Sequence, residues 1–142
     1  MADASVILRA YFPDEATPQA QQLMLDYARG QVNLYAPRLL FLELFNAILV
    51  AARRGRIDRP TLHRLAEEVS LLQIGWVDVE NHGNQILALG KELSLTSYDA
   101  SYVLSAQLKG CRLVTADQRL YNATRHRFPF VLLLENYQKA KS

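Results

Sequence analysis

The chain has 142 residues, half of them hydrophobic, with 16 basic and 14 acidic side chains and a formal net charge of +2. This length and composition suit one globular domain with one core, and they argue against disorder and against a second domain. The charge balance is too mild to identify a nucleic-acid partner, and from the residue pattern we expect neither a signal peptide nor a membrane-spanning segment.

The first half of the chain is predicted to be mainly helical. Helices are expected at residues 4–12, 18–29, 37–54 and 58–73, with a short strand at 32–35. Pro13 ends the first helix, and Thr17 followed by Pro18 is a typical helix start. Gly30 and Gly55 follow the second and third helices as stop residues.

The second half alternates strands with helices. Strands are expected at 76–79, 112–115 and 130–134, and helices at 81–93, 96–109 and 118–125. Such alternation implies βα units. We therefore predict one α/β domain over residues 1–142, with a mainly parallel central sheet of about four or five strands and helices on both faces.

Glu43 lies in the most apolar segment of the sequence. Between Leu39 and Ala52 the only other polar side chain is Asn46, so this helix is expected to be buried on all sides. A buried ionised carboxylate is costly without a partner. Glu43 is either paired with Asn46 or with an arginine elsewhere to fix the core, or it is a ligand directed at a cation in a cleft.

Three other acids stand at predicted helix starts. Asp3 precedes the first helix, Asp99 follows Thr96 at the capping-box spacing, and Asp117 lies between a strand and a helix. Each alone is best explained as a helix cap. However, ligands of a parallel sheet bind beyond the carboxyl ends of its strands. Carboxylates gathered there would repel one another, and a hard cation such as Mg²⁺ or Mn²⁺ would relieve the repulsion.

Four stretches of the sequence, taken together, resemble the PIN domain family, especially the VapC-type toxins of toxin–antitoxin pairs. They are residues 3–5, 43–47, 96–102 and 114–117, the last followed by Leu120. Their order and separation match the family over essentially the whole chain. The resemblance implies a metal-dependent endoribonuclease that cleaves RNA by metal-activated water.

The resemblance also assigns roles to individual residues. Asp3, Glu43 and Asp99 are implied as catalytic acids that bind Mg²⁺ or Mn²⁺, and Asp117 as a fourth acid that binds a second ion or positions water. The supporting residues implied are Ser5, Asn46 and Thr115. The family further implies a homodimer and a cognate antitoxin that occludes the acidic cleft, acting in the cytoplasm, with which the single cysteine is compatible.

The start of the chain departs from the family pattern. The family carries an apolar strand before its first aspartate, whereas only Met1 and Ala2 precede Asp3 here. We expect either a true start further upstream or a fold that lacks most of this strand. The second case would leave a gap beside the site and loosen Asp3.

Basic and aromatic side chains are open to two interpretations. An arginine cluster around the turn after the third helix is either a solvated helix end or a phosphate-contacting patch. It comprises Arg53, Arg54, Arg56 and Arg59. Tyr98, Tyr102 and Trp76 either belong to the core or stack on bases.

Two alternatives to the nuclease remain. One is a catalytically weak or inert PIN-fold interaction module. The other is an acidic-pocket phosphotransfer domain of the phosphatase or receiver type. The phosphatase type needs a second acid where Ser5 stands, and the receiver type needs a lysine soon after the 112–115 strand, where none occurs.

Overall fold

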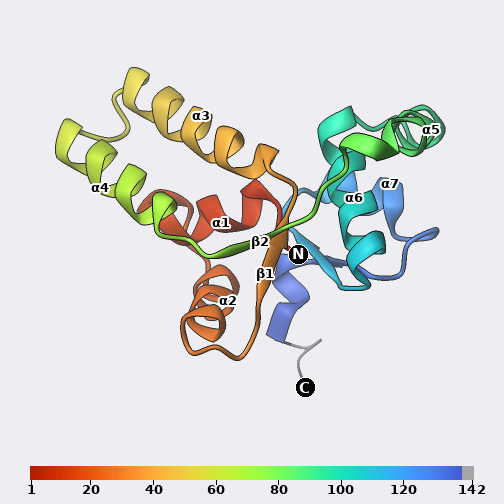
Figure 1. Cartoon of the computed structure of the whole chain (residues 1–142). Coiled ribbons are helices and arrows are strands. Elements are labelled where there is room, and N and C mark those ends of the chain that lie inside the picture. Colours follow the sequence, from red (N-terminus) through yellow and green to blue (C-terminus); the bar gives the residue numbers. More distant parts are fainter. Residues whose placement is uncertain (139–142) are drawn as a thin grey trace.

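The computed structural model describes residues 1–138, and it confirms the single α/β domain. In chain order the elements are α1 (Ala4–Tyr11), η1 (Pro13–Glu15), α2 (Pro18–Ala28), β1 (Leu34–Ala36), α3 (Leu39–Arg53), α4 (Arg59–Ser70), β2 (Ile74–Trp76), η2 (Glu80–His82), α5 (Gly83–Leu93), α6 (Ser97–Lys109), β3 (Leu113–Thr115), α7 (Gln118–Thr124), β4 (Val131–Leu133) and η3 (Leu134–Asn136). Helices α3 and α4 pack as a pair on one side of the strands, and α5, α6 and α7 gather on the other (Figure 1). No helix in this described range is long and apolar enough to cross a membrane.

The four strands are all paired in parallel, as predicted, but they form two separate pairs. Strand β1 pairs with β2, and β3 pairs with β4. Ala2 adds an isolated parallel bridge to Val114, which joins the N-terminal segment to β3. The Met1 carbonyl accepts from the Val114 amide at 2.9 Å, and the Asp3 amide donates to the Val114 carbonyl at 3.3 Å. This bridge places Asp3 directly beside the end of β3.

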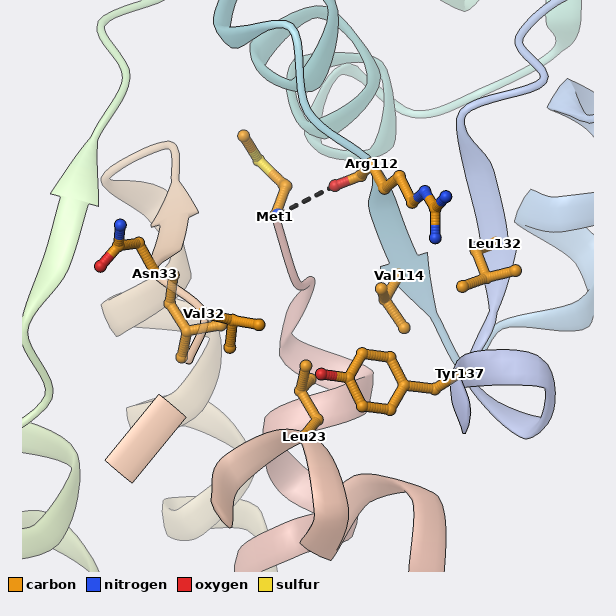
Figure 2. A pocket seen from close by; sticks show the side chains of 9 residues that line it. Met1, Leu23, Val32, Asn33, Arg112, Val114, Leu132 and Tyr137 are labelled. Carbon is orange, nitrogen blue, oxygen red and sulfur yellow. Dashed lines mark hydrogen bonds between the residues drawn. The ribbon is translucent and has the colours of Figure 1, made fainter. Parts of the chain in front are cut away.

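A mostly apolar cavity of about 270 Å³ lies between the two strand pairs (Figure 2). Its lining comes from the N-terminus, α2, the strands and the C-terminal segment: Met1, Leu23, Val32, Asn33, Leu34, Arg112, Val114, Leu132 and Tyr137. One of the two expectations from the sequence was a gap beside the acids, but this cavity borders Met1 and is lined by none of the four candidate acids. The loosening of Asp3 expected with it is not found, because that side chain is buried and held by several hydrogen bonds.

Strand β2 lies two to three residues earlier than predicted. Of the residues predicted as a strand at 76–79, only Trp76 belongs to β2, which pairs with β1 over Ile74–Trp76, and residues 77–79 form a loop. A side chain at Gly75 would meet the Tyr35 ring of the neighbouring strand at 2.4 Å. The register therefore depends on a cross-strand contact that a glycine permits, which local alternation does not reveal.

Helix α3 is buried on only one side, contrary to the expectation of burial all round. Leu40, Leu44 and Ile48 face the core, whereas Leu42 is 74% exposed and Leu49 is 42% exposed. The remaining elements pack against a single face of this helix, so its apolar outer face is open. Exposed apolar stripes of this kind commonly mark interaction surfaces.

Candidate active site

Asp3 is the most buried of the candidate acids. It caps α1, with its Oδ1 accepting from the Val6 amide at 3.4 Å and from the Ser5 hydroxyl. The Thr115 hydroxyl donates to Oδ2. Burial raises the pKa of Asp3 to about 6, although these hydrogen bonds oppose the shift. The carboxylate is therefore costly to ionise but fixed in direction.

The loop after β3 is tied to the N-terminal segment by the same hydroxyls. Thr115 Oγ1 accepts from the Asp117 amide at 3.0 Å, and Ser5 Oγ accepts from the Ala116 amide at 3.0 Å. Asp117 in turn caps α7, accepting from the Arg119 amide at 2.9 Å. Ser5 and Thr115 thus both contact Asp3, as a supporting role requires, and Asp117 is a helix cap within the same network.

Glu43 projects from α3 toward α6. The Tyr102 hydroxyl donates to its Oε1 at 2.7 Å. Burial raises the pKa of Glu43, the bond from Tyr102 lowers it, and the charges of Asp3 and Asp99 raise it further. Within residues 1–138, neither the Asn46 pairing nor the arginine pairing considered from the sequence is found, and Asn46 is exposed without a side-chain hydrogen bond.

Asp99 lies in the first turn of α6, where Thr96 caps the helix by accepting from the Asp99 amide at 3.1 Å. Arg119 donates from Nη2 to Asp99 Oδ2 at 3.3 Å. Burial raises the pKa of Asp99, and the charge of Asp117 adds to the effect, whereas Arg119 opposes it. The backbone amide of Asp99 therefore takes part in the helix cap, whereas its carboxylate interacts with the charges of Arg119 and Asp117.

The acids form one electrostatic group drawn from separate parts of the chain. The charges of Asp3 and Asp99 each raise the pKa of Glu43, and Asp99 also raises the pKa of Asp3. The charge of Asp117 raises the pKa of Asp99, which connects Asp117 to the other acids of this group. Sequence reasoning missed two members of this group: it left Tyr102 between core and base stacking, and it did not consider Arg119. No local pattern identified either contact, since both join distant elements.

The donor chemistry of the group fits a hard divalent cation, because every candidate ligand is a carboxylate oxygen. Burial is the main cause of the raised pKa values of Asp3, Glu43 and Asp99, and repulsion between carboxylates adds to it; a bound cation would oppose both effects. Across residues 1–138, no three acidic, histidine or cysteine side chains stand close enough to hold an ion as they are. Asp3, Glu43 and Asp99 instead direct oxygens at protein donors.

The structure also shows where the aromatic and basic side chains considered for RNA contact lie. Tyr102 is 1% exposed and cannot stack on a base, whereas Tyr98 is 61% exposed. Trp76 packs against Phe41 with ring centroids 4.8 Å apart. In the arginine cluster at the α3–α4 turn, Arg56 pairs with Asp14 at 2.7 Å, so it serves the fold.

The family of the protein follows from comparison with known sequences. A PIN domain model matches residues 1–125, and the chain belongs to the PIN domain family. Among its relatives, Ribonuclease VapC9 of Mycobacterium tuberculosis is 29% identical over 133 residues, which cover 94% of this chain and 97% of that protein. Ribonuclease VapC3 of Pyrobaculum aerophilum is 29% identical over 125 residues, which cover 84% of this chain and 90% of that protein.

A solved structure supports the same fold. The crystal structure of PAE2754 from Pyrobaculum aerophilum superposes with a TM-score of 0.70 at 26% sequence identity, covering 99% of this chain and 96% of that one. Similarity along nearly the full length of both chains agrees with a single domain.

Proposed function

We propose that this chain is a divalent-metal-dependent endoribonuclease, and that it is the toxin of a toxin–antitoxin pair. The observation that carries the proposal is the electrostatic coupling of Asp3, Glu43 and Asp99, which come from three different elements. The names of the relatives, VapC ribonucleases, supply the substrate class. Carboxylates that are partly or fully buried close to one another, with raised pKa values, are candidates for a functional site.

In this proposal Asp3, Glu43 and Asp99 hold Mg²⁺ or Mn²⁺, and Asp117 binds a second ion or positions water. A bound ion would neutralise charge on the scissile phosphate and acidify the attacking water. The chain's own contribution is to fix the acids: two hydroxyls and an amide hold Asp3, and no covalent protein intermediate is required.

Arg119 supplies a positive charge at the edge of the group. Its side chain is 66% exposed while its guanidinium contacts Asp99. An exposed arginine beside the acids is suited to contact the phosphate backbone of RNA, because the guanidinium is always charged and matches phosphate geometry. The proposed site thus combines oxygen ligands with one substrate-facing cation.

The outer face of α3 supports the proposed protein partners, a cognate antitoxin and a second copy of the chain. Leu42, Phe45 and Leu49 recur at helical spacing on this face and are 74%, 38% and 42% exposed. Leu42 precedes Glu43 directly, so a partner on this stripe would bind the helix that carries one of the acids. Replacing Leu42 and Leu49 by serine should weaken antitoxin capture or self-association, measured by sedimentation.

The nuclease proposal is tested with purified protein and a labelled RNA. Cleavage is expected with Mg²⁺ or Mn²⁺ and not with EDTA, and Asp99→Asn should abolish it while the circular dichroism spectrum is retained. Asp78→Asn is the matched control, because Asp78 is an exposed acid paired with Arg38 and is not among the charges that shift the pKa of Asp3, Glu43 or Asp99. Cleavage retained by Asp99→Asn would remove that residue from the mechanism, and inactive wild-type protein would favour the inert interaction module.

A further inference from the structure

One hydrogen bond connects the two sides of the candidate site. Glu43 belongs to α3 and Tyr102 to α6, and the 2.7 Å contact between them spans 59 residues of sequence. Within the described chain, Tyr102 is the sole residue that donates a hydrogen bond to the Glu43 carboxylate, and no ion pair reaches it. The geometry of Glu43 relative to α6 therefore depends on this phenol.

The Tyr102 ring is fixed independently of its hydroxyl. Its side chain is 1% exposed and belongs to the main core cluster with Leu44 and Val103. A tyrosine has few rotatable bonds, and close packing leaves the ring in one orientation. The hydroxyl is consequently a rigid point to which the longer, more flexible glutamate is attached.

The other acids are oriented by different means. Asp3 is held by Ser5, Thr115 and the Val6 amide, and Asp117 by amides of α7. Glu43 has no backbone donor, since it lies in the interior of α3 where amides are used by the helix. Its Oε1 is occupied by the phenol, which leaves Oε2 for a ligand.

We propose that Tyr102 is a positioning residue that holds the Glu43 carboxylate in the orientation needed to bind a divalent cation. This inference rests on the proposed function, since it concerns the same acids. Donors that fix a ligand side chain typically change metal affinity or activity 10- to 100-fold when removed. Tyr102 acts through Glu43 and touches neither ion nor RNA.

The experiment uses the full chain and measures Mn²⁺ binding directly, by electron paramagnetic resonance of free Mn²⁺ without RNA. Tyr102→Phe removes only the hydroxyl and should weaken Mn²⁺ binding about 10- to 100-fold. Tyr137→Phe is the matched control. It removes another buried hydroxyl, which donates to Asp26 at a distance of 2.8 Å and bonds to none of the candidate acids. This variant should leave the Mn²⁺ affinity unchanged.

A double-mutant cycle separates positioning from a general structural effect. In the Glu43→Gln background, adding Tyr102→Phe should cause no further loss of Mn²⁺ affinity, because the ligand it positions is already lost. An equal loss in both backgrounds would overturn the inference, since Tyr102 would then act on the fold and not through Glu43.

A second measurement avoids mutation of Tyr102. In wild-type protein with ¹³Cζ-labelled tyrosine, Mg²⁺ should shift the Tyr102 resonance and not that of Tyr137, and Glu43→Gln should remove this shift. An unmoved Tyr102 resonance at saturating Mg²⁺ would overturn the positioning role.

The failure of this inference is distinguishable from failure of the proposed function. If wild-type protein binds Mn²⁺ and cleaves RNA, and Glu43→Gln weakens both while Tyr102→Phe weakens neither, only the positioning role is wrong. If wild-type protein binds no Mn²⁺, both the metal-dependent nuclease and the positioning role are wrong.

Discussion

Thr115 and Asp3 are joined by a side-chain hydrogen bond although 112 residues separate them in sequence. The same threonine oxygen accepts from the Asp117 amide at 3.0 Å. One hydroxyl therefore couples the buried acid at the chain start to the helix cap that follows β3. The hydroxyl is held in place by β3, where Thr115 is fully buried.

Thr115→Val removes this coupling while keeping a branched side chain of similar shape. The Asp3 carboxylate would lose a donor that lowers its pKa, so its pKa should rise further. We expect the free energy of unfolding at pH 7 to fall by about 1–3 kcal/mol. Chemical denaturation at pH 7 and pH 5 measures this, and the loss should be smaller at pH 5, where Asp3 is largely protonated.

Thr124→Val provides the comparison for this variant. Thr124 is equally buried and donates to the Leu120 carbonyl at 2.7 Å, away from the acids. Its replacement should change stability similarly at both pH values. If Thr115→Val shows the same pH-independent loss, its hydroxyl does not act on the ionisation of Asp3.

The raised pKa of Asp3 makes a second, pH-dependent prediction. The unfolded chain releases the proton near pH 3.8, whereas the folded chain keeps it to about pH 6. The folded state therefore binds more protons in this window, and stability falls as pH rises through it. The contribution of Asp3 amounts to about 3 kcal/mol at most.

Asp3→Asn should remove that part of the slope. Thermal unfolding followed between pH 4 and pH 7 should show the variant and wild type alike at the acid end, with the variant more stable at pH 7. RNA cleavage by wild type should in turn decline below about pH 6, where Asp3 becomes protonated. The assignment would be contradicted if the stability of the wild type and that of Asp3→Asn both increased from pH 4 to pH 6 by the same amount.

Local signals in the sequence predicted the parts of the site that are local. Asp3, Asp99 and Asp117 each stand at a helix start, and each helix start was predicted because capping depends on residues a few positions apart. The stop at Gly55 was predicted for a similar reason, since its φ of +71° favours glycine. Parallel pairing followed from the alternation of strands with helices.

Contacts between distant elements were not predictable in the same way. The pairing of Glu43 with Tyr102 and the register of β2 depend on how helices and strands pack, and no pattern in one segment specifies them. The exposed side of α3 is a further example. Its composition indicated burial, yet Leu42 is 74% exposed, because composition does not reveal how many faces other elements cover.

Arg119 is predicted to matter for RNA binding and little for stability. Arg119 is 66% exposed in its ion pair with the partly buried Asp99, so Arg119→Ala should change the free energy of unfolding by no more than about 1 kcal/mol. If the guanidinium contacts a phosphate, the variant should bind single-stranded RNA more weakly, with the slope of log affinity against log salt reduced by about one. Fluorescence anisotropy in EDTA across a salt series measures this without cleavage.

Arg125→Ala is the control for that series. Arg125 directly follows α7, the helix that carries Arg119, and lies over the Tyr121 ring at 5.8 Å without a contact to Asp99. Its removal should affect the salt slope less. Equal slopes for wild type and Arg119→Ala would exclude a phosphate contact by this residue.

Divalent metal is predicted to stabilise the folded chain through Glu43. A ligand that binds only the folded state at 100 times its dissociation constant adds about 2.7 kcal/mol to the free energy of unfolding, and EDTA should reverse the gain.

Glu43→Gln retains an acceptor for the Tyr102 hydroxyl but removes the charge. It should be more stable than wild type without metal, because burial and the charges of Asp3 and Asp99 raise the pKa of Glu43. If its metal affinity falls 100-fold, the gain at the same Mn²⁺ concentration shrinks to about 0.4 kcal/mol. Denaturation with and without Mn²⁺ measures both effects, with Glu67→Gln on the exposed side of α4 as the control. An equal Mn²⁺ gain in Glu43→Gln and wild type would mean that the ion binds elsewhere.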